Sequence, residues 1–405
     1  MILRARVVVT MDGPPIENGA VAVSGNRIDE VGKFPQIAAR HSGQELVDLG
    51  EQVLLSGLIN AHCHLDYTCL RDKIPGPRSF ADWIRAINAA KAKLGPEDYV
   101  ASINQGFAEA KRFGTTTIAN LTAFPDLISQ VQSPIRTWWF GELIDVRTPE
   151  RANEMVDLGV ECLKGSKNWG LAPHAPFTAS VNLYRRCEEI AGAKKNVLLT
   201  THLAESAEEM SMFRDGSGPL YEFIEQMGRD LSDCNRHGTP LEKFVGATGR
   251  HALPWIVVHL NELIETDFDL MAGLATKFSI VHCPRSHQYF GHSPFQFEKL
   301  RSLGFNVCLG TDSLASNDNL SLFAEMRQFQ KNFPAVSPEK ILSMVTANSA
   351  EVLRQENALG KIRADAYADL IAVPCARPTS VFEEILAFDK RVNWLMLNGA
   401  VQKIA

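Results

Sequence analysis

Cysteine pairs, long apolar runs and blocks of like charge are all missing from this chain of 405 residues. Its eight cysteines are scattered without a CxxC pair, which argues against a thiolate zinc site and favours buried free thiols in a reducing cytoplasm. No apolar stretch is long enough to span a membrane. The N-terminus also lacks the apolar core and the small-residue cleavage site of a signal peptide. We therefore expect a cytoplasmic protein without a membrane partner.

The net charge is small, with a formal value of −6. The chain has no run of like charge long enough to be an interaction tail. This mild acidity argues against a nucleic-acid partner, because nucleic-acid-binding proteins usually carry a basic patch. With 45% hydrophobic residues the chain can bury a large core, and its length allows two domains. The expected partner is a small-molecule substrate, and a homo-oligomer is a state that the sequence leaves open.

Short apolar segments alternate with amphipathic segments through the middle of the chain. The predicted strands are 53–61, 115–121, 135–143, 168–173, 196–202, 255–259, 277–283 and 305–311. The predicted helices are 79–93, 97–113, 148–165, 179–193, 217–229, 260–274, 294–303 and 338–354. Eight strands, each followed by a helix, predict an α/β fold of the (β/α)8 TIM-like barrel class.

The two ends of the chain differ from this middle. Residues 1–54 and 358–405 hold short strands separated by turn residues, and neither end has enough strands for a sheet of its own. We therefore predict that both ends join in one small β-sandwich beside a barrel of residues 55–357. The segment 206–250 is longer than a simple strand-to-helix loop, and we expect it to frame the pocket.

Potential metal ligands stand at the ends of several predicted strands. His62 and His64 follow the first strand, and residues two apart on a strand point the same way. His202 ends the fifth strand and Asp312 follows the eighth. In a parallel barrel these strand ends meet at one face. Three imidazoles and one carboxylate suit one divalent metal ion per chain, with Zn²⁺ as the first expectation and Fe²⁺ or Mn²⁺ as alternatives.

Two more polar side chains occupy the same kind of position. Glu205 lies three residues beyond His202, where its carboxyl would reach a substrate held over the metal and give a proton to a ring nitrogen or a departing amine. The alternative for Glu205 is a solvated loop residue. His259 ends the sixth strand and would either hydrogen-bond a metal-activated hydroxide or become a ligand itself. We predict Glu205, His259 and Asp312 as the catalytic residues.

Other side chains at the expected barrel mouth are candidates for substrate binding. They are His174 after the fourth strand, Arg285 and His287 after the seventh, and Trp83. For Arg285, an ion pair with a surface carboxylate is an equal alternative. The aromatic residues expected to wall the pocket against a flat ring are Phe80, Trp83, Phe290, Phe295 and Phe297.

These ordered motifs resemble those of the amidohydrolase superfamily. The matching residues are Ser56-Gly57-Leu58-Ile59-Asn60-Ala61-His62-Cys63-His64, His202-Leu203-Ala204-Glu205, His259, Gly310-Thr311-Asp312-Ser313 and Ser316-Asn317. No Lys ends the fourth strand, so the resemblance is to the mononuclear-metal branch of cytosine, guanine and adenosine-type deaminases and triazine hydrolases. It implies that the metal ligands are His62, His64, His202 and Asp312. It also implies that Glu205 shuttles protons, while His259 and Asp312 orient and deprotonate the water.

Within this branch, two segments look most like aminodeoxyfutalosine deaminases: residues 202–209 followed by Gly216-Ser217-Gly218, and Phe80-Ala81-Asp82-Trp83-Ile84. Residues 282–287 depart from the Asn-containing version of methylthioadenosine and S-adenosylhomocysteine deaminases, which argues against an adenosine thioether.

The resemblance implies a hydrolase of carbon–nitrogen bonds other than peptide bonds. We expect a deaminase that releases ammonia from an amino-substituted heterocycle, with a 6-aminopurine nucleoside such as aminodeoxyfutalosine as the first candidate. The alternatives are a hydrolase of a cyclic amide or chlorotriazine and, more distantly, a catalytically inactive barrel scaffold.

Overall fold

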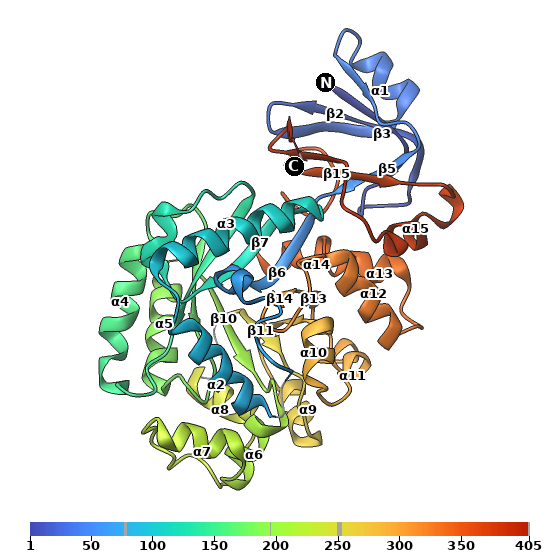
Figure 1. Ribbon diagram of the computed structural model, residues 1–405. Coiled ribbons are helices and arrows are strands. Elements are labelled where there is room, and N and C mark those ends of the chain that lie inside the picture. The colour runs from blue at the N-terminus through green and yellow to red at the C-terminus, as the bar shows by residue number, and fades with distance from the viewer. Residues whose placement is uncertain (77–78, 195, 249–252, 404–405) are drawn as a thin grey trace.

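Two β-sheets organise the molecule (Figure 1). The computed structural model describes all residues except 77–78, 195, 249–252 and 404–405. One sheet is curled and parallel and comes from the middle of the chain, while the other is mixed and comes from both termini. The mixed sheet lies at one end of the molecule, with both ends of the chain beside it (Figure 1).

The strands of the curled sheet follow the chain order in space. They are β6 (Leu58–His64), β7 (Thr115–Thr122), β8 (Arg136–Leu143), β9 (Trp169–Pro173), β10 (Leu198–Leu203), β11 (Trp255–His259), β12 (Ser279–His282), β13 (Val307–Leu309) and β14 (Asp312–Ser313). Neighbours pair in parallel from β6 to β13, and β14 pairs with the free side of β6. Most of these strands are buried on both faces, which explains why they read as apolar runs rather than alternating patterns.

The two ends of the curled sheet meet at residues 310–311. The backbone N–H of Gly310 donates to the carbonyl oxygen of His282 (3.0 Å), and that of Thr311 donates to the carbonyl oxygen of His62 (3.0 Å). A Cβ atom at Gly310 would lie 2.7 Å from the carbonyl oxygen of His62, so glycine allows the first and last strands to approach. The predicted barrel class is confirmed. The predicted eighth strand, 305–311, corresponds to β13, and Asp312 and Ser313 after it form the separate short strand β14.

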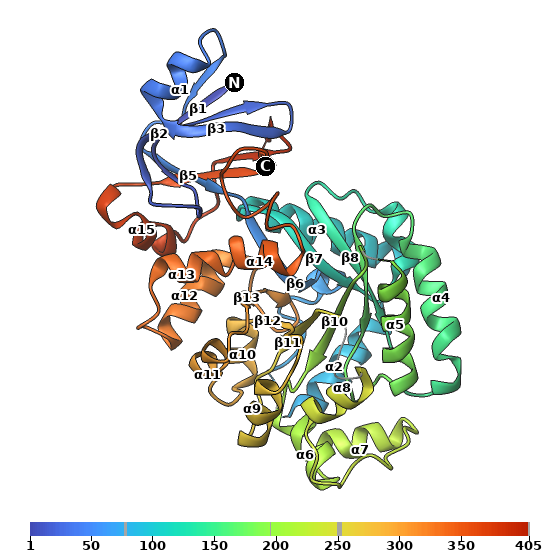
Figure 2. The same ribbon diagram turned by 180° about the vertical axis from the view of Figure 1, so that it is seen from behind.

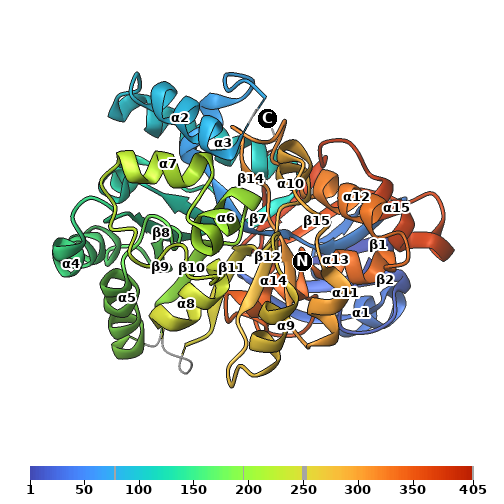
Figure 3. The ribbon, with the colours of Figure 1, turned by 90° about the horizontal axis from the view of Figure 1, so that it is seen from below.

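Helices surround the curled sheet, as the views from behind and from below show (Figures 2 and 3). They are α2 (Phe80–Lys91), α3 (Pro96–Arg112), α4 (Ala152–Leu163), α5 (Val181–Ala193), α6 (Ala207–Asp215), α7 (Pro219–Gln226), α8 (Pro240–Thr248), α9 (Glu265–Ala272), α10 (Pro284–Phe290), α11 (Phe297–Ser302), α12 (Leu322–Asn332), α13 (Pro338–Ser343) and α14 (Ala347–Val352). Five of them begin after a serine whose hydroxyl accepts a backbone N–H: Ser79, Ser180, Ser206, Ser321 and Ser337.

The predicted helices are present, but the segment 338–354 forms two helices, and α6, α8, α10 and α12 were not predicted. The segment 206–250 is therefore largely helical, and its residues 249–250 lie outside the described part of the chain. Within the described residues, no helix combines the length and the apolar character that a bilayer crossing requires. All eight cysteines are free.

The mixed sheet joins both termini. Its strands are β1 (Ile2–Val9), β2 (Ile16–Ser24), β3 (Arg27–Lys33), β4 (Leu46–Asp48), β5 (Gln52–Ser56), β15 (Leu370–Pro374), β16 (Trp394–Leu397) and β17 (Ala400–Val401), and α1 (Phe34–Arg40) and α15 (Val381–Ala387) flank it. The N-terminal and C-terminal strands are joined by β5 and β15. These two strands pair in antiparallel orientation, and Leu55 lies opposite Ile371. The predicted union is present as one continuous sheet. The chain passes between the two sheets at Gly57, close to the predicted boundary after residue 54, and the domain limits themselves stay a prediction.

Candidate metal centre and active site

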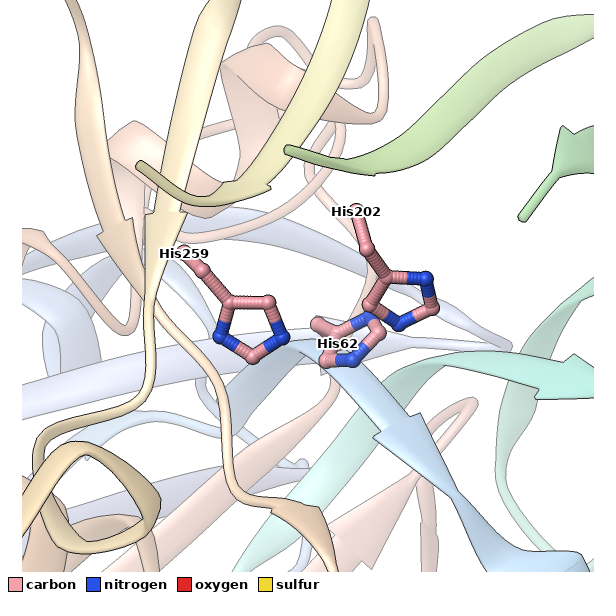
Figure 4. Close-up of side chains that lie close together, drawn as sticks. All are labelled: His62, His202 and His259. Carbon is pink, nitrogen blue, oxygen red and sulfur yellow. The ribbon is translucent and has the colours of Figure 1, made fainter. Parts of the chain in front are cut away.

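Four histidines and one aspartate converge at the carboxyl ends of the parallel strands. The side chains come from β6 (His62 and His64), β10 (His202), β11 (His259) and β14 (Asp312), and all five are buried. Figure 4 shows His62, His202 and His259 pointing toward one another. The ring centroid of His62 lies 5.0 Å from that of His202 and 5.9 Å from that of His259. The structure thus brings together the residues that we predicted at separate strand ends.

Possible ligand atoms of this cluster lie around one point. The Nε2 atoms of His64 and His202 are 3.1 Å apart. Oδ1 of Asp312 lies 3.6 Å from Nε2 of His62 and 4.0 Å from Nε2 of His64. Ligand atoms around a tetrahedral zinc ion lie about 3.3 Å apart, because Zn–N bonds are about 2.0–2.1 Å long. The arrangement therefore has the spacing of a metal site.

The ring nitrogens of His62 support the same conclusion. Neither one has a hydrogen-bond partner within the described residues, although the side chain is completely buried. A buried polar atom without a partner is costly, so native structures rarely contain one unless another group satisfies it. A divalent cation would satisfy this imidazole, and the residues present therefore fit a metal.

Hydrogen bonds orient two of the candidate ligands. Nδ1 of His202 lies 3.0 Å from the carbonyl oxygen of His174, which leaves Nε2 directed at the cluster. Oδ2 of Asp312 accepts hydrogen bonds from the hydroxyls of Ser286 (2.7 Å) and Ser316 (3.2 Å), which leaves Oδ1 toward the histidines. Such outer contacts fix the tautomer and direction of metal ligands.

Burial sets the protonation states of the cluster. Burial, followed by the charge of His62, lowers the pKa of His64 to about 4. Burial also holds the pKa values of His202 and His259 well below their usual range. For Asp312, burial raises the pKa, but the interactions with His62 and the other histidines outweigh it and hold the pKa well below its usual value. Neutral imidazoles and an ionised carboxylate are the forms that bind metals.

Glu205 lies at the edge of the cluster, with Oε1 3.6 Å from Nε2 of His259. Its backbone is held on both sides: the N–H donates to the carboxylate of Glu209 (2.8 Å), and the carbonyl accepts from Nδ2 of Asn261 (3.0 Å). Burial, followed by the charges of Asp312 and Glu209, raises the pKa of Glu205 well above its usual value. This buried carboxyl therefore retains a proton that it can donate to a base, and it is not a solvated loop residue.

The backbone turns sharply at the same strand ends. His259, the last residue of β11, has φ = 75°, and Asp312, the first residue of β14, has φ = 54°. Ala204, next to Glu205, has φ = 49°. Residues with a Cβ rarely adopt this left-handed conformation, and such strain gathers where a side chain must be placed for function.

A pocket opens over the cluster, and α2 forms one of its walls. Its lining residues are His64, Tyr67, Phe80, Trp83, Ile84, Ile87, Asn88, Lys91, Glu142, Ile144, His174, Phe177, Thr178, His202, Glu205, His259, Asp312 and Ser313. Two predicted substrate contacts, His174 and Trp83, are among them. Nδ1 of His174 lies 2.6 Å from the hydroxyl of Thr178, and burial lowers the pKa of His174 to about 3. Its Nε2 edge is therefore an uncharged polar group of the pocket wall.

The other two predicted substrate contacts lie elsewhere. Neither Arg285 nor His287 is among the described residues that line this pocket. The guanidinium of Arg285 pairs with the carboxylate of Asp318 and donates to Oδ1 of Asn319, which is the ion-pair alternative that the sequence left open. Nε2 of His287 lies 2.9 Å from the carbonyl oxygen of Ser293.

Of the five aromatic residues expected to wall the pocket, only some lie at it. Phe80 and Trp83 line it. Phe290 packs against both of them, with centroid distances of 5.5 and 5.0 Å. Phe295 and Phe297 are buried in the hydrophobic core, so the prediction that they wall the pocket is wrong. Their apolar character serves packing between helices and strands.

Several pocket residues were missed by the sequence analysis, among them Glu142, Tyr67, Asn88 and Lys91. Glu142 lies near the end of β8, and its Oε1 is 3.9 Å from Nδ1 of His64. The strand-end rule used for the histidines could have found Glu142. Tyr67, Asn88 and Lys91 come from the segment after β6 and from α2, where no local signal distinguishes a pocket residue from a packed or solvated one.

Comparison with known proteins agrees with this geometry. The amidohydrolase family matches residues 53–401. The 5-methylthioadenosine/S-adenosylhomocysteine deaminase of Syntrophobacter fumaroxidans is 30% identical, over 93% of this chain and 85% of that protein. The crystal structure of Helicobacter pylori aminofutalosine deaminase in complex with methylthio-coformycin has a TM-score of 0.85 and 21% identity, covering 99% of this chain and 100% of that chain.

An adenosine deaminase from Xanthomonas campestris with bound zinc has the same fold, with a TM-score of 0.79 and 24% identity over 99% of this chain and 92% of that chain. The family match includes the whole curled sheet and, of the mixed sheet, β5, β15, β16 and β17. The chain therefore belongs to the amidohydrolase family, as its motifs predicted, and is a hydrolase that acts on carbon–nitrogen bonds.

Proposed function

We propose that the protein is a metal-dependent hydrolytic deaminase that releases ammonia from a 6-aminopurine nucleoside derivative. One observation carries the proposal: a metal-binding set and a buried carboxyl that holds a proton border the same pocket. The similar proteins named above also support it, because their names denote deaminases of adenosine-type compounds.

One divalent ion would be held by His62, His64, His202 and Asp312. The unpartnered nitrogens of His62 support this set, and the zinc in the adenosine deaminase favours Zn²⁺ over Fe²⁺ or Mn²⁺. When bound, such an ion makes hydroxide available near neutral pH. The close approach of Glu205 to His259 favours a role for this histidine in proton handling rather than metal binding.

The protons would be handled by three side chains. The carboxyl of Glu205, kept protonated by burial, gives its proton to the purine ring nitrogen next to the reacting carbon. His259 and Asp312 orient the attacking water, and Asp312 accepts its proton. Water adds to the carbon that bears the amino group. The amine takes up the proton that Asp312 accepted, the C–N bond breaks and ammonia leaves, while the proton of the added hydroxyl returns to Glu205.

The pocket wall would position the purine nucleoside. Phe80, Trp83 and Phe177 offer apolar surfaces against which a flat ring packs well. His174 is retained as a polar substrate contact. Arg285 and His287 are not retained, because they lie outside the described lining of the pocket.

The metal set can be tested by elemental analysis of protein purified without added metal. We expect close to one equivalent of a transition metal per chain, and the His202→Ala variant should lose most of it. His237→Ala is the matched control, since this histidine is exposed and outside the cluster, and it should keep the metal. Full activity in a thoroughly chelated sample would contradict the proposal.

The reaction can be tested by ammonia release from metal-loaded protein. The compounds to compare are aminodeoxyfutalosine, methylthioadenosine, S-adenosylhomocysteine, adenosine, adenine and cytosine. We expect nucleosides with an extended 5′ group, aminodeoxyfutalosine first, to give a much higher kcat/KM than adenine or cytosine. The thioethers belong in the set because of the curated relative, although residues 282–287 argue against them. A preference for cytosine, or opening of a cyclic amide without ammonia, would overturn the substrate assignment.

A further inference from the structure

The pocket extends along the whole of α2. Six residues of this helix line it, and they recur three or four positions apart: Phe80, Trp83, Ile84, Ile87, Asn88 and Lys91. One continuous face of the helix therefore borders the pocket. From Phe80 to Lys91 the helix rises by about 16 Å, at about 1.5 Å per residue. The row of lining residues is thus longer than a purine ring, so it can also border a group attached to the nucleoside.

The polarity of this helix face changes along its length. The first four lining residues are apolar, and the last two are Asn88 and Lys91. Lys91 is the only lysine or arginine among the described residues of the pocket wall. An apolar stretch followed by one cation matches a ligand with an apolar body and an anionic end.

Lys91 forms no ion pair with a carboxylate of the described residues, although the buried carboxyl of Asp66 lies near enough for the two charges to interact. Nζ of Lys91 donates to the hydroxyl of Tyr67 (2.7 Å) and lies 4.7 Å from the centroid of the same ring. Across the described residues, no carboxylate lies within 4.0 Å of this nitrogen. Glu142, an acidic residue of the pocket wall, has its Oε1 3.9 Å from Nδ1 of His64. Since Lys91 donates to the oxygen of Tyr67, the phenol hydrogen is free to donate to a ligand.

We propose that Lys91, together with the hydroxyl of Tyr67, binds a carboxylate on the group attached to the purine nucleoside, and thereby selects the substrate. This inference rests on the proposed function, which places the purine over the metal-binding cluster. One ammonium and one hydroxyl match a single negative charge. A phosphate dianion is more often held by several cations, a bidentate arginine or a row of backbone N–H groups.

A matched pair of compounds tests the proposal: 5′-(3-carboxypropylthio)-5′-deoxyadenosine and 5′-butylthio-5′-deoxyadenosine. They have the same chain length and differ in the terminal carboxylate. Their kcat/KM values are compared by ammonia release for the metal-loaded wild type, Lys91→Met and Lys91→Arg. Lys93→Met is the control, because Lys93 lies just beyond the same helix, is exposed and does not line the pocket.

The wild type should prefer the carboxylate. Lys91→Met should lower the ratio of the two kcat/KM values about ten- to a hundredfold, the range for losing a charged hydrogen bond, mainly through KM. Lys91→Arg should restore part of the ratio, and Lys93→Met should keep the wild-type ratio. A wild-type preference for the butyl compound, or an unchanged ratio in Lys91→Met, would overturn the inference. A higher kcat/KM for adenosine 5′-phosphate than for the carboxylate would overturn the choice of anion.

Failure of the proposed function has a different signature, since neither compound would then release ammonia from the wild type. Equilibrium dialysis of both compounds would still decide the inference in that case. Selective loss of carboxylate binding in Lys91→Met supports it, and equal binding by wild type and variant overturns it. Circular dichroism of each variant shows whether a loss reflects misfolding, and Lys91→Gln replaces Lys91→Met in both assays if the latter does not fold.

Discussion

The carboxyl of Glu205 is the side chain on which the proposed proton transfer depends most. It is buried beside His259, and its pKa is raised mainly by that burial. Glu205→Gln keeps the size of the side chain and removes the transferable proton. We expect kcat to fall by about two to four orders of magnitude, the range for losing a general acid or base, while the metal content persists. Steady-state kinetics and elemental analysis of the same preparation measure both.

Glu161→Gln is the control for this substitution, because the carboxyl of Glu161 is 63% exposed and pairs with Lys164 on the surface of the protein. It should have wild-type kinetics. An unchanged kcat in Glu205→Gln would remove Glu205 from the reaction, whatever its position in the pocket.

The neighbouring Glu209 makes stability depend on pH. It is completely buried, and burial raises its pKa to about 8 from a usual value of 4.5, although backbone N–H groups donate to it. Between these two values the folded chain keeps a proton that the unfolded chain releases. Its stabilising contribution is therefore complete below pH 4.5, declines as pH rises, and is lost above about pH 8.

Glu209→Gln removes this titration. We expect the unfolding free energy of the variant to decline less than that of the wild type from pH 5 to 8, by up to about 1 kcal/mol per pH unit. Urea unfolding of both proteins across this range measures the difference. Parallel curves would show that Glu209 does not hold a proton in the folded state.

Single residues also show where sequence-based prediction works and where it stops. His62, His202 and Asp312 were predictable because the step from an apolar strand to a polar residue is local in the sequence. The direction of the Arg285 side chain was not predictable, because it depends on an ion pair with the carboxylate of Asp318, 33 residues away in the sequence. The role of Lys91 likewise depends on Tyr67, which approaches only when α2 folds over the strand ends.

Among the elements, the junction between β13 and β14 leaves no space for a side chain at Gly310. A Cβ at Gly310 would lie within 3.0 Å of three atoms of His62, two of them backbone. We expect Gly310→Ala to lower the unfolding free energy by about 1–3 kcal/mol, the usual range for overpacking, and to reduce metal content by moving His62. Thermal unfolding and elemental analysis provide the two measurements.

Gly246→Ala is the control within the same barrel. Gly246 lies in α8, and nothing stands within 4 Å of a Cβ there, so alanine should be neutral or stabilise by about 0.5–1 kcal/mol. Wild-type stability in Gly310→Ala would show that the sheet ends separate without cost.

Elements were predictable to the extent that their patterns are long and periodic. The strands of the barrel were found because they are buried on both faces. Short α6 was missed, although Ser206 offered a cap whose hydroxyl accepts from Glu209. The separate short strand β14 could not be read from its sequence, because it follows from the contact of Gly310 with β6.

For the molecule as a whole, the two sheets are connected by a buried ion pair. Arg136, at the start of β8, donates from Nε and Nη2 to Oδ2 of Asp369 (3.2 and 3.1 Å), just before β15. The two side chains are only 9% and 3% exposed, and the guanidinium lies 3.7 Å from the ring centroid of Tyr367. Arg136→Met should cost about 3–5 kcal/mol of unfolding free energy, because it leaves a buried carboxylate unpaired.

Arg377→Met supplies the comparison. Arg377 is 72% exposed and pairs with Glu384, so its loss should cost at most about 1 kcal/mol. Urea unfolding measures both variants. Equal losses would mean that the contact between the sheets contributes no more than a surface pair.

The pairing of β5 with β15 also dictates when the protein can finish folding. Leu55 is synthesised early, but its partner Ile371 is synthesised near the end of the chain. Cys63 likewise pairs with the much later Asp312, and this pairing completes the barrel. Pairings between such distant positions form slowly, and until they form the edges of β5 and β6 stay open to other chains. We therefore expect a chain that stops before β15 to keep its first sheet unfinished and to aggregate, even though every proposed metal ligand had already been made.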